Sequence, residues 1–553
     1  MDNQRLFPLL ALAFILFLLW ENWLQFQAQK HPPPPPVTAP AATVQGQSGA
    51  VAPGAPARDV PNLAPTAAAP APTTLESGQR IRVVTDVYEA EIDTVGGDLR
   101  LLGLLTYPES LQQPQQPFEL LEDSTAHFFI VQSGLGSSDS PAPNHYARFT
   151  SEQTEYRLQD GHNSLEVKLT WSEGGITVTK SYTFQRGSFV IDLKQRVENA
   201  SAQEWRGWQY RQLQRTSPPS QGGMFSGVST YTGGVISTPE VKYQKIPFGA
   251  MAKENLNLTA KGGWAAMIQH YFLAALVPGE EQTDTFYSKV IDGSRFVLGM
   301  LGQPQTIAPG STGEFSTRLY AGPKLQNVME TVAPHLQLTV DYGIFTVIAE
   351  PLFWLLKLIH NVVGNWGWAI IILTILIKGV FFKLSETSYR SMARMRNLAP
   401  KINSLKERYG DDKQRMNQAM MELYKKEKIN PLGGCLPIAV QIPVFIALYW
   451  MLLESVELRQ APFMFWIHDL AVKDPYYVLP IIMGLTMVVQ QKLNPPPADP
   501  TQAKMMMILP LVFTVMFLWF PAGLVLYWTV SNILSITQQY VITKRMGALH
   551  VAT

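Results

Sequence analysis

One lysine stands inside a segment that is otherwise apolar. Residues 366–382 read WGWAIIILTILIKGVFF, and Lys378 is the single charged residue among them. At about 1.5 Å per residue, this segment makes a helix of roughly 25 Å, close to the thickness of a bilayer core. A lysine near mid-bilayer costs about 3 kcal/mol on insertion scales. Thr374 lies one turn before Lys378 on the same helix face.

From this helix alone, two interpretations of Lys378 are open. Its aliphatic stem could carry the ammonium group to the membrane interface, or the lysine could line a functional polar pocket. The pocket is the better interpretation only if other segments supply polar groups at the same depth. The arrangement of the other segments must therefore decide between the two.

Several other chemistries are excluded by the residues present. The chain has 553 residues and one cysteine, Cys435, so no internal disulfide can form. We find no Cys/His cluster with metal-ligand spacing, no phosphate-binding or dinucleotide fingerprint and no GxSxG elbow. The net charge of +1 gives no indication of a nucleic-acid partner. We expect no catalytic residue, no cofactor and no metal.

The N-terminal part of the chain predicts a membrane tether. Residues 6–24 are almost entirely apolar, and no small-residue cleavage site follows them, so we expect an uncleaved signal anchor. Residues 27–79 are rich in Pro, Ala and Thr, which predicts a disordered, extended linker.

Residues 80–335 predict a large antiparallel β-sandwich. In residues 176–184, Thr and Ser alternate with apolar residues, interrupted by Lys180, as in a strand with one wet face. Residues 81–92, 165–171 and 189–197 predict further strands. A sugar-active enzyme of mutarotase type would need a histidine and a carboxylate in one groove, with four histidines available: His127, His145, His162 and His270. We favour a structural or partner-binding role for this domain.

The remaining apolar segments predict a six-span membrane protein. Residues 436–453, 476–489, 505–519 and 524–541 join the anchor and the Lys378 helix. Residues 383–430 carry twelve Lys/Arg and six Asp/Glu, which places them in the cytoplasm and the β-domain in the periplasm. Their Met and Leu stripe predicts a helical hairpin with a kink at Pro400. The basic charge could serve topology alone or dock ribosomes and other partners.

This topology places the polar residues of four spans in the half of the membrane nearest the cytoplasm. The outer halves carry Leu, Ile, Phe, Trp and Tyr instead. Interhelical hydrogen bonding explains any single Ser or Gln, but a lysine and a one-sided distribution favour a hydrated pocket open to the cytoplasm. The predicted lining comprises Thr374, Lys378, Gln441, Ser531, Asn532 and Ser535.

Three long segments resemble signatures of a known family. Residues 430–451 read NPLGGCLPIAVQIPVFIALYWM, residues 456–470 read VELRQAPFMFWIHDL and residues 518–532 read LWFPAGLVLYWTVSN. They are similar to the YidC/Oxa/Alb family of membrane protein insertases. The likeness to the Gram-negative form extends over the anchor, the β-domain, the five-helix core and the cytoplasmic hairpin.

The resemblance implies insertion and folding of inner-membrane proteins, alone or beside the Sec translocon. It implies a hydrophilic groove that is open to cytoplasm and lipid and holds a positive charge. Lys378 takes that position, where the family usually has Arg. The lysine keeps a point charge there but lacks the bidentate fork of a guanidinium group. The expected partners are nascent inner-membrane proteins, the Sec translocon with its accessory subunits, the translating ribosome and the lipid bilayer.

The resemblance also implies that client helices slide along the third and fifth spans. The residues expected to contact clients are Ile442, Phe445, Met505, Met506 and Trp528. Flexible methionines suit a surface that accepts many apolar partners, although ordinary packing explains each one equally well. A polar-solute transporter is the alternative function, and it would show internal repeats and polar groups at both depths. An envelope sugar-modifying enzyme comes third.

We therefore predict a multidomain inner-membrane protein with cytoplasmic termini, a five-helix transmembrane core and a periplasmic β-sandwich of supersandwich type. The expected segments are the anchor (1–26), linker (27–79), β-sandwich (80–335), interfacial amphipathic helix (336–350), second transmembrane helix (351–382), hairpin (383–430), third to sixth transmembrane helices (431–453, 475–492, 505–519 and 522–541) and cytoplasmic tail (542–553).

Overall fold

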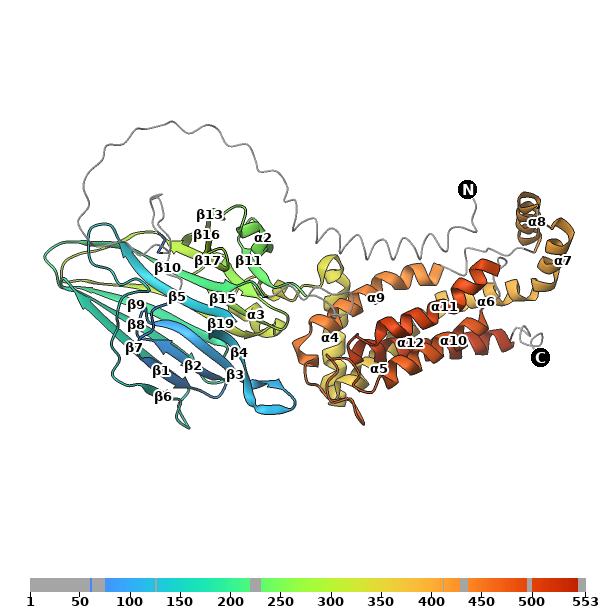
Figure 1. The fold of residues 1–553 in the computed structure, drawn as a ribbon, viewed down its shortest axis with the longest axis horizontal. Helices are drawn as coiled ribbons and strands as arrows, with labels where there is room; N and C mark the ends of the chain where they lie inside the picture. The colour runs from blue at the N-terminus through green and yellow to red at the C-terminus, as the bar shows by residue number, and fades with distance from the viewer. Residues whose placement is uncertain are drawn as a thin grey trace, which may run out of the picture. The chain divides into compact units, whose positions relative to one another are not determined.

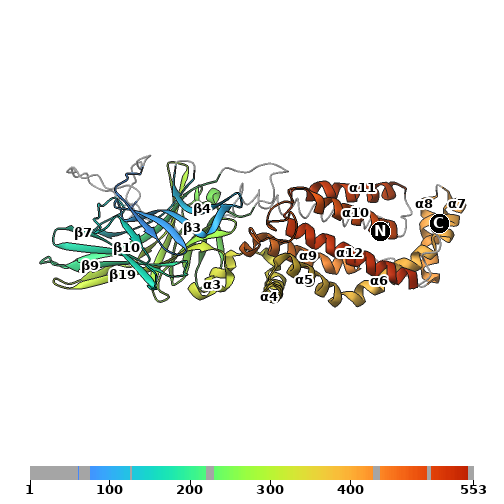
Figure 2. The same ribbon diagram turned by 90° about the horizontal axis from the view of Figure 1, so that it is seen from below.

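A computed structural model of the chain describes residues 60–61, 75–124, 127–218, 230–410, 412–427, 436–494 and 500–545. The predicted anchor and most of the linker and tail lie outside the described residues. The chain forms two compact units that divide between residues 339 and 340. The first unit is made mainly of strands and the second of helices (Figures 1 and 2).

The first unit consists of two packed β-sheets. Among the described residues, the larger has eleven strands, of which ten run in the order β13 (Asn257–Lys261), β16 (Thr283–Ile291), β17 (Arg295–Gly302), β10 (Trp205–Thr216), β5 (Phe128–Ser137), β4 (Gln113–Asp123), β3 (Asp98–Ser110), β2 (Tyr88–Asp93), β1 (Arg80–Val84) and β6 (Glu155–Arg157), while β18 (Gln305–Ile307) pairs with β10. In the same part of the chain, the smaller has eight strands, in the order β12 (Gln244–Ile246), β11 (Gly233–Ser237), β14 (Trp264–Ile268), β15 (Phe272–Val277), β19 (Thr312–Pro323), β9 (Val190–Asn199), β8 (Ile176–Gln185) and β7 (Ser164–Glu173).

The predicted β-sandwich is confirmed, with two differences in detail. The strand expected at residues 81–92 is two strands, because Thr85 Oγ1 accepts from the backbone N–H groups of Val87 and Tyr88 and turns the chain between β1 and β2. In addition, β1 pairs with β6 in parallel, so the larger sheet is not wholly antiparallel. The short helices α2 (Phe248–Met251) and α3 (Gln326–Val332) and a 3₁₀ turn (Leu336–Thr339) complete the unit.

Lys180, which interrupts the apolar face of β8, points between the sheets. Its ammonium group is fully buried and donates to the carbonyls of Gly96 at 2.8 Å and Ser133 at 2.9 Å. Asp98 Oδ1 lies 3.9 Å away. The lysine therefore ties the β2–β3 turn and strand β5 to the opposite sheet, because a buried ammonium group must find acceptors there.

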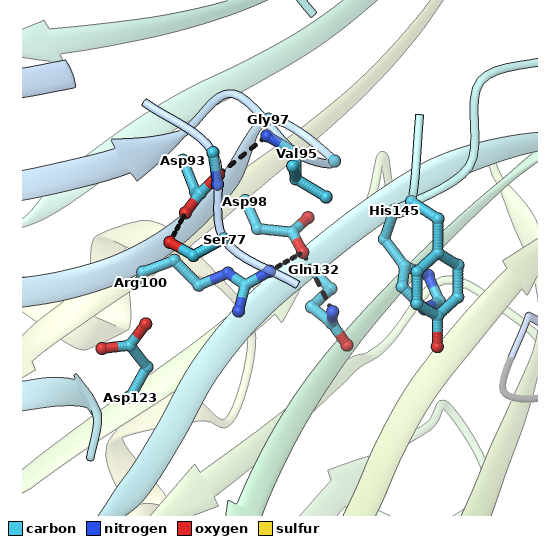
Figure 3. A network of polar contacts seen from close by, with 12 residues as sticks. Ser77, Asp93, Val95, Gly97, Asp98, Arg100, Asp123, Gln132 and His145 are labelled. Atoms are coloured by element: carbon cyan, nitrogen blue, oxygen red, sulfur yellow. Dashed lines mark hydrogen bonds and ion pairs between the residues drawn. The ribbon is translucent and has the colours of Figure 1, made fainter. Parts of the chain in front are cut away.

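Asp98 joins this lysine to a wider polar network on the larger sheet. Gln132 Nε2 donates to Asp98 Oδ2 at 2.9 Å, and the Arg100 guanidinium lies 3.6 Å from the same oxygen (Figure 3). Burial raises the pKa of Asp98, against the opposing effect of the two cations. Nearby, the Asp93 carboxylate accepts from the Ser77 hydroxyl at 2.7 Å and fixes the segment that leads into β1.

The second unit is helical. A 3₁₀ turn (Gly343–Phe345) leads into α4 (Thr346–Val363), followed by α5 (Trp366–Val380), α6 (Phe382–Asn397), α7 (Ala399–Tyr409), α8 (Lys413–Lys426), α9 (Leu436–Glu454), a 3₁₀ turn (Val456–Leu458), α10 (Val478–Leu493), α11 (Pro500–Phe517) and α12 (Ala522–Arg545). In both views α9, α10, α11 and α12 run alongside one another, α4 crosses one end, and α7 and α8 lie at the other end (Figures 1 and 2).

The helix boundaries differ from the predicted ones at the start of this unit. The helix expected at residues 336–350 begins at Thr346 and continues to Val363, so it takes the first thirteen residues of the predicted span 351–382. Gly364 ends it with φ 71°, a left-handed conformation that favours glycine. Asn365 then caps α5, because its side-chain oxygen accepts from the Trp368 N–H at 3.1 Å.

The predicted hairpin contains three helices, because α5 and α6 meet at a bend of 66° and α6 ends before Pro400. Pro400 lies in the first turn of α7, where a missing N–H breaks no helical hydrogen bond. Gly410, with φ 51°, ends α7 at the expected break. Asp412 caps α8 by accepting from the Arg415 N–H at 3.1 Å.

By length and hydropathy, one described helix could cross a membrane, at residues 343–363, and the bent pair α5–α6 would make a second if it forms one span. Residues 440–454, 478–493 and 504–517 form shorter apolar helices. Their outer faces are apolar and exposed, as a lipid solvent allows, with examples at Leu485, Met507 and Leu511. The six-span topology stays a prediction.

Lys180 should make the stability of the β-domain depend on pH. Burial lowers the pKa of Lys180 from its usual value to about 8. Between about pH 8 and pH 9.5 the unfolded chain therefore holds a proton that the folded domain has released, and stability should rise with pH. We expect this rise to vanish in Lys180→Met, measured by hydrogen–deuterium exchange of β8 and β5 in the full chain. An equal rise in both proteins would contradict the prediction.

Candidate functional site

Lys378 lies in the last turn of α5 and its ammonium group is held inside the helical unit. Lys378 Nζ donates to Ser535 Oγ of α12 at 2.8 Å. Ser535 is buried, and the Tyr389 side chain of α6 lies near it. Three helices therefore meet at one hydroxyl group, next to the α5–α6 bend.

The bend itself is bonded to α12. Gln538 Nε2 donates to the backbone carbonyl of Phe382 at 3.1 Å, at the first residue of α6. Ser531, Ser535 and Gln538 recur at intervals of four and three residues, so they share one face of α12. This face is directed to α5 and α6, and Ser531 is half-buried on it.

Asn532 lies on a different face of α12 and contacts α10. Its Nδ2 donates to Thr486 Oγ1 at 3.2 Å, and one heptad later Gln539 Nε2 donates to Asn494 Oδ1 at 3.0 Å. These amides join α10 to α12. Sequence reasoning missed Gln539 and Asn494, although the seven-residue spacing from Asn532 to Gln539 was a signal for a second polar face.

Two other expected lining residues are placed differently. The Thr374 hydroxyl is buried and donates to the Ile370 carbonyl at 2.7 Å, so it is satisfied within its own helix. Gln441 is half-buried on α9, and no described residue exchanges a hydrogen bond with its amide. The structure thus brings together Lys378, Tyr389 and Ser535, with Ser531 on the same face of α12, and does not join Thr374 or Gln441 to them by hydrogen bonds.

Aromatic rings fill the other half of the bundle, toward α4. The Phe445 and Trp528 rings meet edge to face with centroids 4.4 Å apart, and Phe517 lies 4.9 Å from Trp528. Phe445 and Trp528 were expected to contact clients, but much of their surface packs between α9, α11 and α12. Met505 is 53% exposed, and Ile442 and Met506 are half-buried.

The segment between α9 and α10 covers this aromatic end. Asn365 Nδ2 donates to the carbonyls of Pro462 and Phe463 at 3.1 and 3.2 Å. The first turn of α12 is held as well, because Gly523 N–H donates to the Leu470 carbonyl at 2.9 Å. The Phe463 ring packs against Gly367, where a Cβ atom would collide with it.

Asp474 organises the same segment. Its buried carboxylate accepts from Trp466 Nε1 at 2.9 Å, from Tyr476 N–H at 3.0 Å and from Leu479 N–H at 2.7 Å. The last of these caps α10. Burial also raises the pKa of Asp469, while the Ala471 N–H, at 2.8 Å, opposes that shift.

The histidines considered for a sugar-active site are dispersed. His145 is buried, with Nδ1 2.6 Å from the Tyr210 hydroxyl. His127 precedes β5, His162 lies in the turn before β7, and His270 stacks on Tyr271 between β14 and β15. In the described part of the chain, no group of three His, Cys, Asp or Glu residues could hold a metal ion.

Comparison with known proteins matches both units. Residues 80–355 match the family model described as the YidC periplasmic domain, and residues 358–548 match the 60Kd inner membrane protein model. The chain is 53% identical over 552 residues to the membrane protein insertase YidC of Nitrosococcus oceani, covering 99% of both chains. The chain belongs to the YidC family of membrane protein insertases.

Other relatives agree with this assignment. The membrane protein insertase YidC of Methylococcus capsulatus is 53% identical over 549 residues, covering 99% of both chains. A solved structure, an active YidC insertase with the first transmembrane domain resolved, matches 84% of this chain and 93% of its own at 16% identity and a TM-score of 0.37. On the two family models and these two relatives, the chain is a YidC-family membrane protein insertase, with the β-sandwich as its periplasmic domain and the helices as its inner-membrane part.

Removing the Asp474 carboxylate should loosen the segment between α9 and α10. Asp474→Ala loses three hydrogen bonds, including a helix cap, and should lower the free energy of unfolding by about 2 kcal/mol. The measurement is thermal unfolding in detergent, followed by tryptophan fluorescence. Asp412→Ala removes the exposed cap of α8 and serves as the control, with an expected loss below about 1 kcal/mol. Equal losses in the two variants would show that Asp474 has no special role.

Proposed function

We propose that this insertase works without ATP, through a hydrated, positively charged groove beside α5, α6, α9 and α12, open to cytoplasm and lipid. The observation that supports it is the hydrogen bond from Lys378 to Ser535. A lysine that snorkelled to the interface would need no partner on another helix. An ammonium group held between three helices places a cation where client chains can pass.

The groove would lower the barrier for moving a polar tail across the membrane. A tail that enters hydrated space in the cytoplasmic half leaves only the outer half of the bilayer to be crossed. Lys378 attracts acidic residues of the tail, and Ser531 and Gln441 offer hydrogen bonds along the walls. Thr374 contributes packing, since its hydroxyl is bonded to its own helix.

Client helices would leave the groove along apolar surfaces of α9 and α11. Met505, Met507 and Leu511 are exposed on α11, and Ile442 is half-buried on α9. Flexible thioethers can repack against clients of different shape. Phe445 and Trp528 act mainly as the floor of this path, because they pack against each other.

The remaining assignments complete the proposal. The N- and C-termini face the cytoplasm, with six spans counted from the anchor. The helices α6, α7 and α8 offer basic side chains to ribosomes, and the Sec translocon and its accessory subunits act beside the insertase on larger clients. No nucleic acid is bound directly, and no catalytic step is required. A polar-solute transporter would need a polar path through the end where Phe445, Phe517 and Trp528 pack.

The charge at position 378 should matter more than its shape. Lys378→Arg should keep insertion near normal, whereas Lys378→Ala should slow clients with acidic tails about fivefold, the effect of roughly 1 kcal/mol for a charge pair in a wet site. Lys378→Glu should be worse than Ala for acidic tails, because like charges then meet. The assay is protease protection of tail variants in membranes carrying each insertase at equal level.

A nearby exposed lysine provides the control for this series. Lys383 lies five residues further on and its side chain is 91% exposed, so Lys383→Ala should leave all clients unaffected. Equal defects of Lys378→Ala with acidic and neutral tails would show that Lys378 supports the bundle and does not attract clients.

The β-domain should be dispensable for inserting a simple client. Deleting residues 80–335 removes a unit with its own core and leaves α4 to α12 intact. We expect insertion of a short single-span client to stay above about half of normal, scored by protease protection after pulse labelling. Full loss with a stably expressed deletion protein would place part of the machinery in the periplasm.

A further inference from the structure

The larger sheet has an outward face with its own side-chain pattern. On β5 and β10, Leu135 and Trp205 pack with residues of the smaller sheet, so their faces point inward. Because side chains alternate along a strand, Trp208, Tyr210 and Gln212 of β10 point outward. The β5 residues opposite these three are Gly136, Gly134 and Gln132.

Aromatic rings cover glycines on this outward face. A Cβ atom on Gly136 would collide with the Trp208 indole, and one on Gly134 would collide with the Tyr210 ring. The same relation holds on β16 and β17, where Tyr287 covers Gly299. The three rings therefore lie against the backbones of neighbouring strands, and with Leu301 they form a low aromatic platform.

A row of polar groups runs beside the platform. The Tyr287 hydroxyl donates to Gln212 Oε1 at 2.7 Å, Gln212 Nε2 to Gln132 Oε1 at 2.9 Å, and Gln132 Nε2 to Asp98 Oδ2 at 2.9 Å. Gln214, the next outward residue of β10, is fully buried, yet its amide nitrogen and oxygen have no hydrogen-bond partner among the described residues.

A second buried donor lies within the platform. Trp208 is 5% exposed, and within the described residues its Nε1 has no acceptor. A buried N–H without a partner costs about 1–3 kcal/mol, so native proteins rarely leave one in this state. Trp208 Nε1 and Gln214 Nε2 are therefore donors for a chain lying over the platform.

A residue of the linker already packs here. Val60 is half-buried against the cluster of Trp208, Tyr210 and Leu301, and Pro61 follows it half-buried. A proline-containing extended chain has no internal hydrogen bonds and offers free carbonyls. Aromatic grooves with a few donors are the surfaces that bind such chains.

We propose that Trp208, Tyr210, Tyr287 and Leu301 form a docking surface for an extended proline-containing chain, and that residues 60–61 of this protein's own linker are its occupant. The linker is then fixed at a point well before β1, which begins at Arg80. The docked valine packs against the platform, whose two unpaired donors are open to backbone carbonyls of a bound chain.

Photo-cross-linking of the full chain in membranes tests this placement. A benzophenone amino acid at position 61 should cross-link to peptides of β10 or β17, and Val60→Asp should lower that yield about tenfold, as expected for losing one buried valine. Val60→Ile should keep the yield. Both changes lie in the linker, so neither can unfold the sheets, and benzophenone at Gln47 gives the background.

Three outcomes would overturn the proposal. These are a yield from position 61 no higher than from position 47, a yield unchanged by Val60→Asp, and cross-links between copies in isotopically mixed protein.

A peptide of residues 55–66 added to the full chain carrying Val60→Asp and Pro61→Gly gives an independent readout. It should bind more tightly than a scrambled peptide, and Gln214→Ala should weaken that binding severalfold; equal binding of both peptides would overturn the proposal.

Discussion

The structure of the helical unit depends on placing one ammonium group inside a bundle that faces lipid. Lys378 donates a hydrogen bond to Ser535, and the Tyr389 side chain lies near the same serine. Gln538 donates to the backbone carbonyl of Phe382, where α5 ends and α6 begins. These groups must lie at one depth, because an unpaired cation in an apolar surrounding is too costly to keep. The apolar residues can then occupy the remaining surfaces, with rings at one end and exposed aliphatic and methionine side chains on α10 and α11.

The β-domain meets the same physical requirement by a different route. Lys180, Asp98 and Arg211 are buried between or beside the sheets, and each is held by carbonyls or opposite charges. Removing one such partner leaves a buried charge unpaired. These networks therefore specify how the sheets pair more than they stabilise the fold. The two units thus share one feature: Lys180, Asp98, Arg211 and Lys378 each have a polar partner on another element, which makes the packing specific.

Sequence reasoning predicted the large features well, because the periodicity of apolar residues reports directly on burial. The β-sandwich and the break at Gly410 followed from the pattern of side chains, and the family followed from long specific segments. Helix ends were harder, since the left-handed turn at Gly364 and the cap at Asn365 are local events within a continuous apolar run. For the site, helix rotation could not be predicted from the sequence. Thr374 and Asn532 were both expected to line the groove, yet one bonds to its own helix and the other to α10.

The bend between α5 and α6 has an electrostatic consequence. Because α5 ends at Val380, Lys378 occupies its last turn, where the carbonyl ends of the peptide dipoles give the helix a partial negative charge. The bend therefore creates a local field that favours a cation at this position, where no described carboxylate forms an ion pair with Lys378. If α5 continued straight into α6, these carbonyls would accept hydrogen bonds from the N–H groups of the next turn, and the field would disappear. The position can thus stay charged while offering no fixed anion that would compete with an acidic segment.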